Sequence, residues 1–222
     1  MEFAAFRRLS RDDIMRMLDV EGFEHVEAAR RAGHGAMCVT GHFGTWELTG
    51  AWVAANGVPM SYLVGEQTNA RVDDVMNNLR RTQGIGIITR TSALKKVLLA
   101  LRANETVALL ADQDARKGGV VVDFLGRPAS TVRGPALFAI RARCPIIPLS
   151  VHREGTRLRL TFEAPMWPDP SLDEEESVLQ LTRYYTDALS RCIRRYPDQY
   201  FWPHRRWKST AALEAAAPSP PA

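Results

Sequence analysis

The chain has 222 residues, of which 45% are hydrophobic and 24% are charged. These proportions lie close to globular averages, so they exclude a wholly disordered or fibrous chain. The 29 Lys and Arg residues against 25 Asp and Glu give a formal net charge of +4. This mild excess suits an anionic partner, such as a lipid phosphate or an acidic carrier protein, without requiring one.

Membrane-spanning and secretory segments are not expected. The longest charge-free run, 48–65, is broken by Asn56-Gly57 and Pro59, and the charged N-terminal residues lack the apolar core of a signal peptide. The cysteines form no CxxC pair, so we expect a reducing compartment and neither a disulfide framework nor a zinc site. They are Cys38, Cys144 and Cys192.

Helical and strand-like segments alternate along the chain. Ser10 caps a predicted helix at 11–19, and Gly33 closes a second at 23–32. The remaining predicted helices are 45–55, 69–83, 92–103 (with Ser92 as its cap), 133–143 and 171–195. The predicted strands are 36–40, 60–64, 85–89, 106–111, 145–151 and 157–162, with a loop-rich stretch over 112–128.

This alternation predicts an α/β fold with a mixed, mainly parallel central sheet flanked by helices. We expect a single domain over 1–210 and a disordered Ala/Pro-rich tail over 211–222. The last predicted helix opens on Ser171 and the acidic run 173–176 and closes on arginines. Such a charge pattern complements the helix dipole, so the acids are interpreted as helix-end residues rather than a metal site.

A histidine and an acid follow the first predicted strand, in the block GHFGTWE at 41–47. Ligands of α/β folds gather where strands end, and His42 has a side chain that accepts a proton near neutral pH. Glu47 comes five residues later, which on one helix places the two side chains about 140° apart. The two can therefore cooperate only if His42 precedes the helix.

The start of that helix is also a candidate anion site. The backbone N–H groups of Gly44 and Thr45 would be free there to bind a phosphate or a developing oxyanion. The alternative is a loop histidine packed on Trp46, with Glu47 in solvent.

Two acids close the strand 106–111. Asp112 is placed to orient a histidine, and Asp114 lies at the same sheet edge; the alternative is an Asx turn or helix cap. The block 120–131, followed by Arg133, offers contacts to an anionic or thioester substrate, or else forms a hairpin and helix cap.

The segment 194–208 holds five Lys or Arg residues and five aromatic residues against one acid. Such a composition favours a bilayer interface, stacking on single-stranded nucleic acid, or packing on the core. No GxSxG, P-loop, GxGxxG or HExxH motif occurs, so hydrolase, NTPase, dinucleotide and zincin functions lack support.

Three blocks together resemble a known family. They are EGFEHVEAARRAGHGAMCVTGHFGTWEL, LLADQDARKGGVVVDFLGRPASTVRGPALFAIR and YPDQYFWPHRRWK, in this order. They are similar to the bacterial lipid A biosynthesis acyltransferases, the late lauroyl and myristoyl transferases, a family that also includes the mycobacterial phosphatidylinositol mannoside acyltransferases. The resemblance covers about residues 16–208 and implies a glycerolipid-acyltransferase-like fold.

The resemblance implies transfer of an acyl chain from an acyl-carrier-protein or acyl-CoA thioester to a hydroxyl of a membrane glycolipid. His42 would be the general base and Glu47 the acid of the His-x4-Asp/Glu motif. In the glycolipid branch the acid matching Asp112 would pair with the histidine, while an arginine holds Glu47. Arg80 is the candidate for that arginine, with Arg81 and Arg90 as alternatives.

Two features depart from the family pattern. Members usually begin with a hydrophobic membrane helix and further residues before the first block, so this chain is expected to be a truncated form or to contact the membrane through its basic, aromatic surface. Many members also carry Asn where this chain has Thr45.

The sequence is interpreted as a peripheral acyltransferase at the cytoplasmic face of the bacterial inner membrane. No cofactor, metal or nucleic acid is expected, and an acyl groove is expected between 45–55 and the elements after Pro128. The residues expected to contact substrate or lipid are Gly44, Thr45, Arg80, Asp114, Arg133, Arg205 and Arg206, with Lys208 beside them at the membrane. The rival hypothesis is a non-catalytic lipid- or nucleic-acid-binding module.

Overall fold

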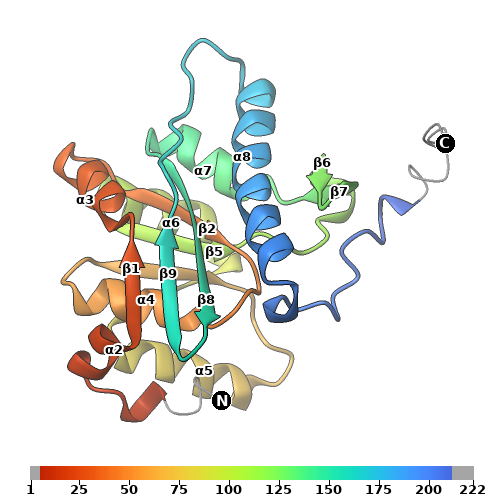
Figure 1. Cartoon of the computed structure of the whole chain (residues 1–222). Coiled ribbons are helices and arrows are strands. Elements are labelled where there is room, and N and C mark those ends of the chain that lie inside the picture. The colour runs from red at the N-terminus through yellow and green to blue at the C-terminus, as the bar shows by residue number, and fades with distance from the viewer. Residues whose placement is uncertain (1–5, 212–222) are drawn as a thin grey trace.

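Strands and helices alternate along the chain in the computed structural model, which describes residues 6–211. The strands form a seven-stranded sheet that has helices on both faces (Figure 1). The helices are η1 (Phe6–Arg8), α2 (Arg11–Met17), α3 (Phe23–Arg31), α4 (Glu47–Ala55), α5 (Ala70–Thr82), η2 (Arg90–Ser92), α6 (Ala93–Arg102), η3 (Arg116–Gly118), α7 (Gly134–Ala142), α8 (Glu174–Arg195) and η4 (Pro197–Gln199). The strands are β1 (Leu18–Glu21), β2 (Ala36–Thr40), β3 (Met60–Val64), β4 (Ile85–Thr89), β5 (Thr106–Leu110), β6 (Val120–Phe124), β7 (Arg127–Thr131), β8 (Ile146–Glu154) and β9 (Arg157–Phe162).

The strand order in the sheet is β1-β9-β8-β2-β5-β3-β4. Every neighbouring pair is parallel except β8 and β9, which form an antiparallel hairpin. The prediction of a mixed, mainly parallel sheet is therefore confirmed. Strands β6 and β7 form a separate hairpin that lies beyond α8 in Figure 1.

The central strand β2 is buried on both faces, as its continuous apolar run predicts. Ala36 and Cys38 pack in a cluster with α2, α3 and α4, whereas Met37 and Val39 pack in a second cluster with α6, α7 and α8. This alternation is the two-residue period of a strand covered on both sides. The residue after β2 thus emerges from the core at the carboxyl edge of the sheet.

Several predicted elements differ from the structure. The helix predicted to reach residue 19 ends at Met17, because 18–21 pairs with β9 as a strand. The predicted loop 112–128 contains β6 and the start of β7. Ser92 donates its hydroxyl to Thr89 O instead of capping α6. Helix α8 begins at Glu174 rather than 171, because Asp173 caps it and exchanges hydrogen bonds with Glu176; the acidic run is a helix end, as predicted.

The tail predicted over 211–222 lies, apart from its first residue, outside the described residues. Within 6–211, the helices are all too short or too polar to cross a bilayer.

Candidate active site

His42 and Asp112 meet at the carboxyl ends of neighbouring strands. Strands β2 and β5 are parallel, with Thr40 opposite Leu110. The residues that follow therefore leave the sheet at the same edge. This is the edge at which parallel sheets hold ligands.

Two hydrogen bonds join the pair. The His42 ring Nδ1 lies 2.9 Å from Asp112 Oδ1, and the His42 backbone N–H donates to Oδ2 at 2.9 Å. The imidazole is 28% exposed, whereas the Asp112 side chain is 3% exposed. Gly41 permits this approach, because a Cβ there would stand 3.1 Å from two Asp112 carbons and 2.6 Å from Leu189 Cδ2.

Asp112 is held in its ionised form. Burial acts to raise the pKa of Asp112, but the hydrogen bonds and charge of His42 outweigh it, so this pKa lies below its usual value. An ionised Asp112 accepts a hydrogen bond from the Nδ1–H group and so fixes the tautomer of the ring that carries its proton on Nδ1. Nε2 is then the nitrogen left to take a proton from a substrate.

Glu47 faces away from this pair and binds Arg80. The Arg80 Nη2 and Nε donate to the Glu47 carboxylate at 2.6 Å and 3.1 Å, and Nη1 donates to Asn77 at 2.9 Å. Of the three candidate arginines, Arg80 is thus the one that holds Glu47. Arg81 instead donates to Asn78 on the exposed face of α5.

This ion pair fastens α4 to α5 in the interior. Glu47 is 8% exposed and Arg80 5% exposed. Burial raises the pKa of Glu47, against the opposing effect of the Arg80 hydrogen bonds and charge. The Arg80 guanidinium also lies over the Trp46 ring, 5.7 Å from its centre, so the pair supports the residue that precedes α4.

Replacing Arg80 with alanine should lower the free energy of unfolding by about 3–5 kcal/mol, because it leaves the buried Glu47 carboxylate without its partner. Urea unfolding followed by circular dichroism measures the loss. Arg81→Ala removes the same charge from an exposed site of the same helix and should change stability by no more than about 0.5 kcal/mol. Equal losses in the two variants would show that the pair does not stabilise the fold.

The backbone N–H of Gly44 is not free, contrary to the prediction. Its N–H donates to Gln199 O at 2.9 Å, so this group is not free to bind a phosphate or oxyanion. Its φ of +56° and a Cβ position 1.7 Å from Val151 O explain the glycine. Thr45 lies between Gly44, whose N–H is hydrogen-bonded, and the start of α4.

Asp114 binds the C-terminal segment. Its N–H donates to His204 Nε2 at 2.9 Å, and its carboxylate accepts the backbone N–H groups of Ser209 and Arg116, each at 2.9 Å. Burial acts to raise the pKa of Asp114, but these hydrogen bonds outweigh it and the pKa is lowered. The carboxylate predicted to contact substrate thus joins two parts of the chain.

Arg206 is buried, not at the surface as predicted. Its side chain is among the largest that are fully enclosed, and its guanidinium donates to Ser130 O and Thr131 Oγ1 in β7. It also lies over the Phe124 ring, 5.0 Å from its centre. A charge with these partners fixes the C-terminal segment to the β6–β7 hairpin and does not reach a membrane. Arg205 is exposed.

Arg133 is not brought to His42. Its guanidinium pairs with Glu175 in the first turn of α8. Glu175 stands about 21 Å along the helix axis before Leu189, the α8 residue against Gly41. Arg133 therefore lies away from His42, and its contact with a substrate stays a prediction.

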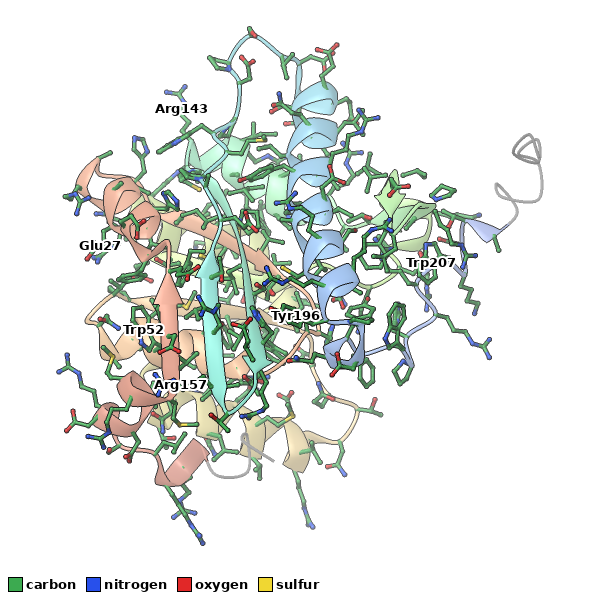
Figure 2. All side chains as sticks on the ribbon, viewed as in Figure 1. Glu27, Trp52, Arg143, Arg157, Tyr196 and Trp207 are labelled. Carbon is green, nitrogen blue, oxygen red and sulfur yellow. The ribbon has the colours of Figure 1, made fainter. Side chains whose placement is uncertain are left out.

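Aromatic residues border His42 on the solvent side. The ring centres of Trp46 and Phe201 lie 6.1 Å and 6.0 Å from that of the imidazole, and Phe201 is 52% exposed. Further along, the segment 201–208 packs on the β6–β7 hairpin, near which Trp207 lies in Figure 2. The Arg127 guanidinium of β7 lies over the Trp207 ring. The sequence patterns gave Gln199, Phe201 and His204 no individual role beyond their place in the basic, aromatic segment 194–208. Their place in the third family block was the signal available.

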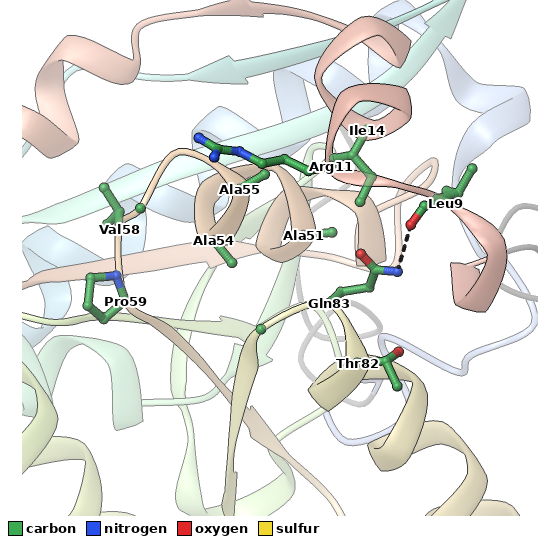
Figure 3. Close-up of a pocket in the computed structure, with 12 residues that line it drawn as sticks. Leu9, Arg11, Ile14, Ala51, Ala54, Ala55, Val58, Pro59, Thr82 and Gln83 are labelled. Atoms are coloured by element: carbon green, nitrogen blue, oxygen red, sulfur yellow. Dashed lines mark hydrogen bonds between the residues drawn. The ribbon is translucent and has the colours of Figure 1, made fainter.

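Two pockets lie away from His42. One, of about 490 Å³, is at the amino ends of β3 and β4 (Figure 3) and is lined by Ala51, Val58, Pro59 and Gly84 among others. The other, of about 480 Å³, lies between β8, β9 and the end of α8 around His152. Neither is the acyl groove predicted between 45–55 and the elements after Pro128. Among the residues of 6–211, no group of three His, Cys, Asp or Glu side chains is arranged to hold a metal ion.

Comparison with known proteins identifies the family of the chain. The sequence model of the bacterial lipid A biosynthesis acyltransferases matches residues 1–209. The chain belongs to this family. Family membership confirms the resemblance drawn from the three sequence blocks.

Relatives within the family act on different glycolipids. The phosphatidylinositol mannoside acyltransferase of Mycolicibacterium smegmatis is 26% identical over 90% of this chain and 66% of its own length. The lipid A biosynthesis palmitoleoyltransferase and lauroyltransferase of Escherichia coli are each 27% identical, over 91% and 88% of this chain and 65% and 63% of their own lengths. The chain thus spans less than two thirds of the length of these relatives.

Proposed function

We propose that the chain transfers a fatty acyl group from a thioester to a hydroxyl of a membrane glycolipid. The observation that carries this proposal is the partly exposed His42 ring, which is hydrogen-bonded through Nδ1 to the buried Asp112. Membership of the acyltransferase family supports it. The relatives' names all indicate transfer of an acyl chain in glycolipid synthesis, but they differ in the glycolipid and in the acyl chain. They therefore support a class of acceptor and not one acceptor molecule.

His42 is the general base in this mechanism. Nε2 takes the proton of the acceptor hydroxyl as its oxygen attacks the thioester carbonyl, and Asp112 stabilises the resulting imidazolium. The tetrahedral intermediate then collapses, the carbon–sulfur bond breaks, and the imidazolium returns the proton to the departing thiolate. The backbone N–H of Thr45, next to the engaged Gly44, is the proposed donor to the oxyanion.

Product formation tests this function. The protein is incubated with acyl-carrier-protein or acyl-CoA, each combined with a lipid A precursor or a phosphatidylinositol mannoside, and products are detected by mass spectrometry. Acylated glycolipid in at least one combination is expected, and the productive donor identifies the carrier. Failure of all four combinations with folded protein would overturn the proposal.

The surface around residues 201–208 is the proposed membrane contact, at the cytoplasmic face of the inner membrane. Phe201 and Trp202 are 52% and 48% exposed, and Arg205 and Lys208 are exposed beside them. Aromatic rings and basic side chains of this kind favour the bilayer interface. The same surface lies next to His42, which would bring a membrane-bound hydroxyl to the ring.

Neutralising Arg205 and Lys208 together as glutamines should weaken binding to anionic vesicles by about 2 kcal/mol, or roughly 30-fold, at low salt. Vesicle sedimentation measures binding, and in about 1 M salt the difference should disappear because the charges are screened. Arg102→Gln with Arg143→Gln removes two exposed charges near the amino edge of the sheet and serves as the matched control. Equal binding by the two double variants would reject the proposed surface.

A further inference from the structure

The segment 199–204, here called the strap, lies against the loop that carries His42. The N–H of Phe201 donates to His42 O at 2.9 Å, and Gln199 O accepts the N–H of Gly44 at 2.9 Å. Between these two bonds Phe43 and Tyr200 form an antiparallel bridge, and both side chains are buried. The strap thus pairs with the backbone on both sides of Phe43, and one of the two bonds is made to the carbonyl of His42 itself.

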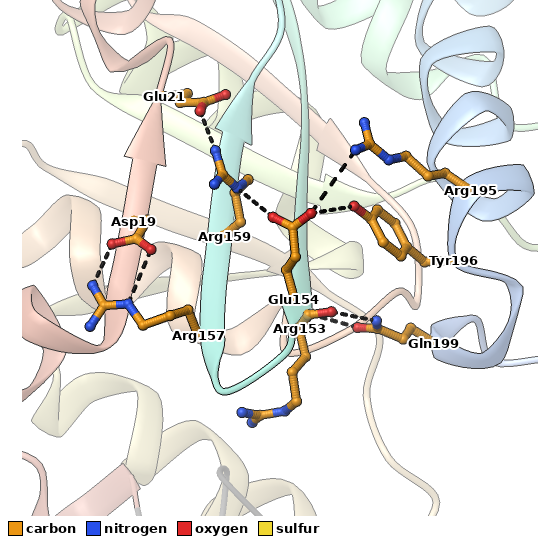
Figure 4. Close-up of polar contacts among 9 residues, drawn as sticks. All are labelled: Asp19, Glu21, Arg153, Glu154, Arg157, Arg159, Arg195, Tyr196 and Gln199. Atoms are coloured by element: carbon orange, nitrogen blue, oxygen red, sulfur yellow. Dashed lines mark hydrogen bonds and ion pairs between the residues drawn. The ribbon is translucent and has the colours of Figure 1, made fainter.

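The Gln199 side chain ties the strap to the sheet. Its Oε1 accepts the N–H of Arg153 at 2.7 Å, and its Nε2 donates to Arg153 O at 2.8 Å (Figure 4). The amide therefore satisfies both backbone groups of one β8 residue, as a neighbouring strand would. Next to it, Glu154 accepts the Tyr196 hydroxyl at 3.2 Å, so the end of α8 is attached at the same place.

The other end of the strap reaches the loop of Asp112. His204 Nε2 accepts the N–H of Asp114, two residues after the carboxylate that binds His42. One segment therefore holds both loops of the His42–Asp112 pair, and Gln199 is the residue that connects it to β8. Its side chain lies on β8 and not against the imidazole, so it acts on the ring through the backbone.

We propose that Gln199 is a positioning residue that holds the His42 loop in register for proton transfer. This inference rests on the proposed function of His42. Loss of the two side-chain bonds frees the strap from β8, which lets the peptide of His42 shift while Asp112 still binds the ring. A displacement of about 1 Å at a reacting group lowers turnover by up to about 100-fold.

Two variants of Gln199 test the proposal, with Asp198→Ala as control. Gln199→Ala removes both bonds. Gln199→Glu keeps the acceptor for the Arg153 N–H and loses the donor to the Arg153 carbonyl. This second variant tests the proposal if the alanine variant does not fold. Asp198 is exposed in the same turn, and its replacement should leave turnover unchanged.

The expected result is a fall in kcat of about 10- to 100-fold in the Gln199 variants, with KM for donor and acceptor within about twofold of wild type. Amide hydrogen exchange measured by NMR should accelerate at Gly44 and Phe201, and the ring ¹⁵N signals of His42 should shift. A merely structural role would lower the folded fraction without moving these signals in the folded protein.

Two outcomes would overturn the proposal. Unchanged exchange at Gly44 and Phe201 would show that Gln199 does not hold the strap. Faster exchange with wild-type kcat would show that the strap does not position His42. If wild type itself transfers no acyl group, the proposed function fails separately, and unshifted His42 ring signals in the variants would then overturn the positioning role.

Discussion

Replacing His42 with alanine is expected to lower the rate of acyl transfer by about 100- to 10,000-fold. The reason is that Nε2 is the nitrogen left to deprotonate the acceptor once Nδ1 is bound to Asp112. Glycolipid affinity should stay close to the wild-type value, because the exposed aromatic and basic side chains near the ring remain. Steady-state turnover and vesicle binding measure the two effects separately.

His34 provides the matched control for this substitution. It lies in the turn before β2, whereas His42 lies after the same strand, and its ring contacts Trp167 at the far edge of the sheet. His34→Ala should leave turnover unchanged. Normal transfer by His42→Ala would remove the base assignment and favour a lipid-binding module without catalysis.

Replacing Asp112 with asparagine should cost about 100- to 10,000-fold in kcat, more than Glu47→Gln. An asparagine amide that donates to Nδ1 places the ring proton on Nε2, so that Nε2 no longer accepts a proton. Glu47 binds Arg80 rather than His42, so its glutamine variant should affect stability more than turnover.

The comparison is made on folded protein, with kcat measured beside urea unfolding for both variants. Wild-type activity of Asp112→Asn would reject its orienting role. A greater loss of turnover in Glu47→Gln would instead mean that the motif acid takes part in catalysis.

Sequence patterns predicted several of the parallel strands well. The boundaries of β2, β3 and β4 agree with the predicted strands to the residue, since each is an apolar run between turn residues. Strand β1 was missed because only four residues pair with β9, and two of them are only half-buried. The hairpin β6–β7 was predicted only as the alternative for the block 120–131, because its glycines and polar residues resemble a loop, and the structure confirms that alternative.

The pairing of His42 with Asp112 was predicted for a physical reason, but two long-range contacts near the site were not predicted. Residues five apart cannot face each other on one helix, which favoured Asp112 over Glu47 as the partner of His42. The burial of Arg206 contradicts the usual exposure of arginine and depends on acceptors in β7 more than 70 residues away. The capture of the Gly44 N–H by Gln199 likewise depends on a contact that no local pattern encodes.

The separation in sequence between His42 and Asp112 has a consequence for folding. Their hydrogen bonds join residues 70 positions apart, and the strap that holds both loops follows the final long helix. Contacts of such long range form late, after local helices and neighbouring strands. The pairing of β2 with β5 in the core spans the same 70 positions. The base therefore becomes competent only when these central strands have paired, and an intermediate without that pairing has no competent base to expose to thioesters.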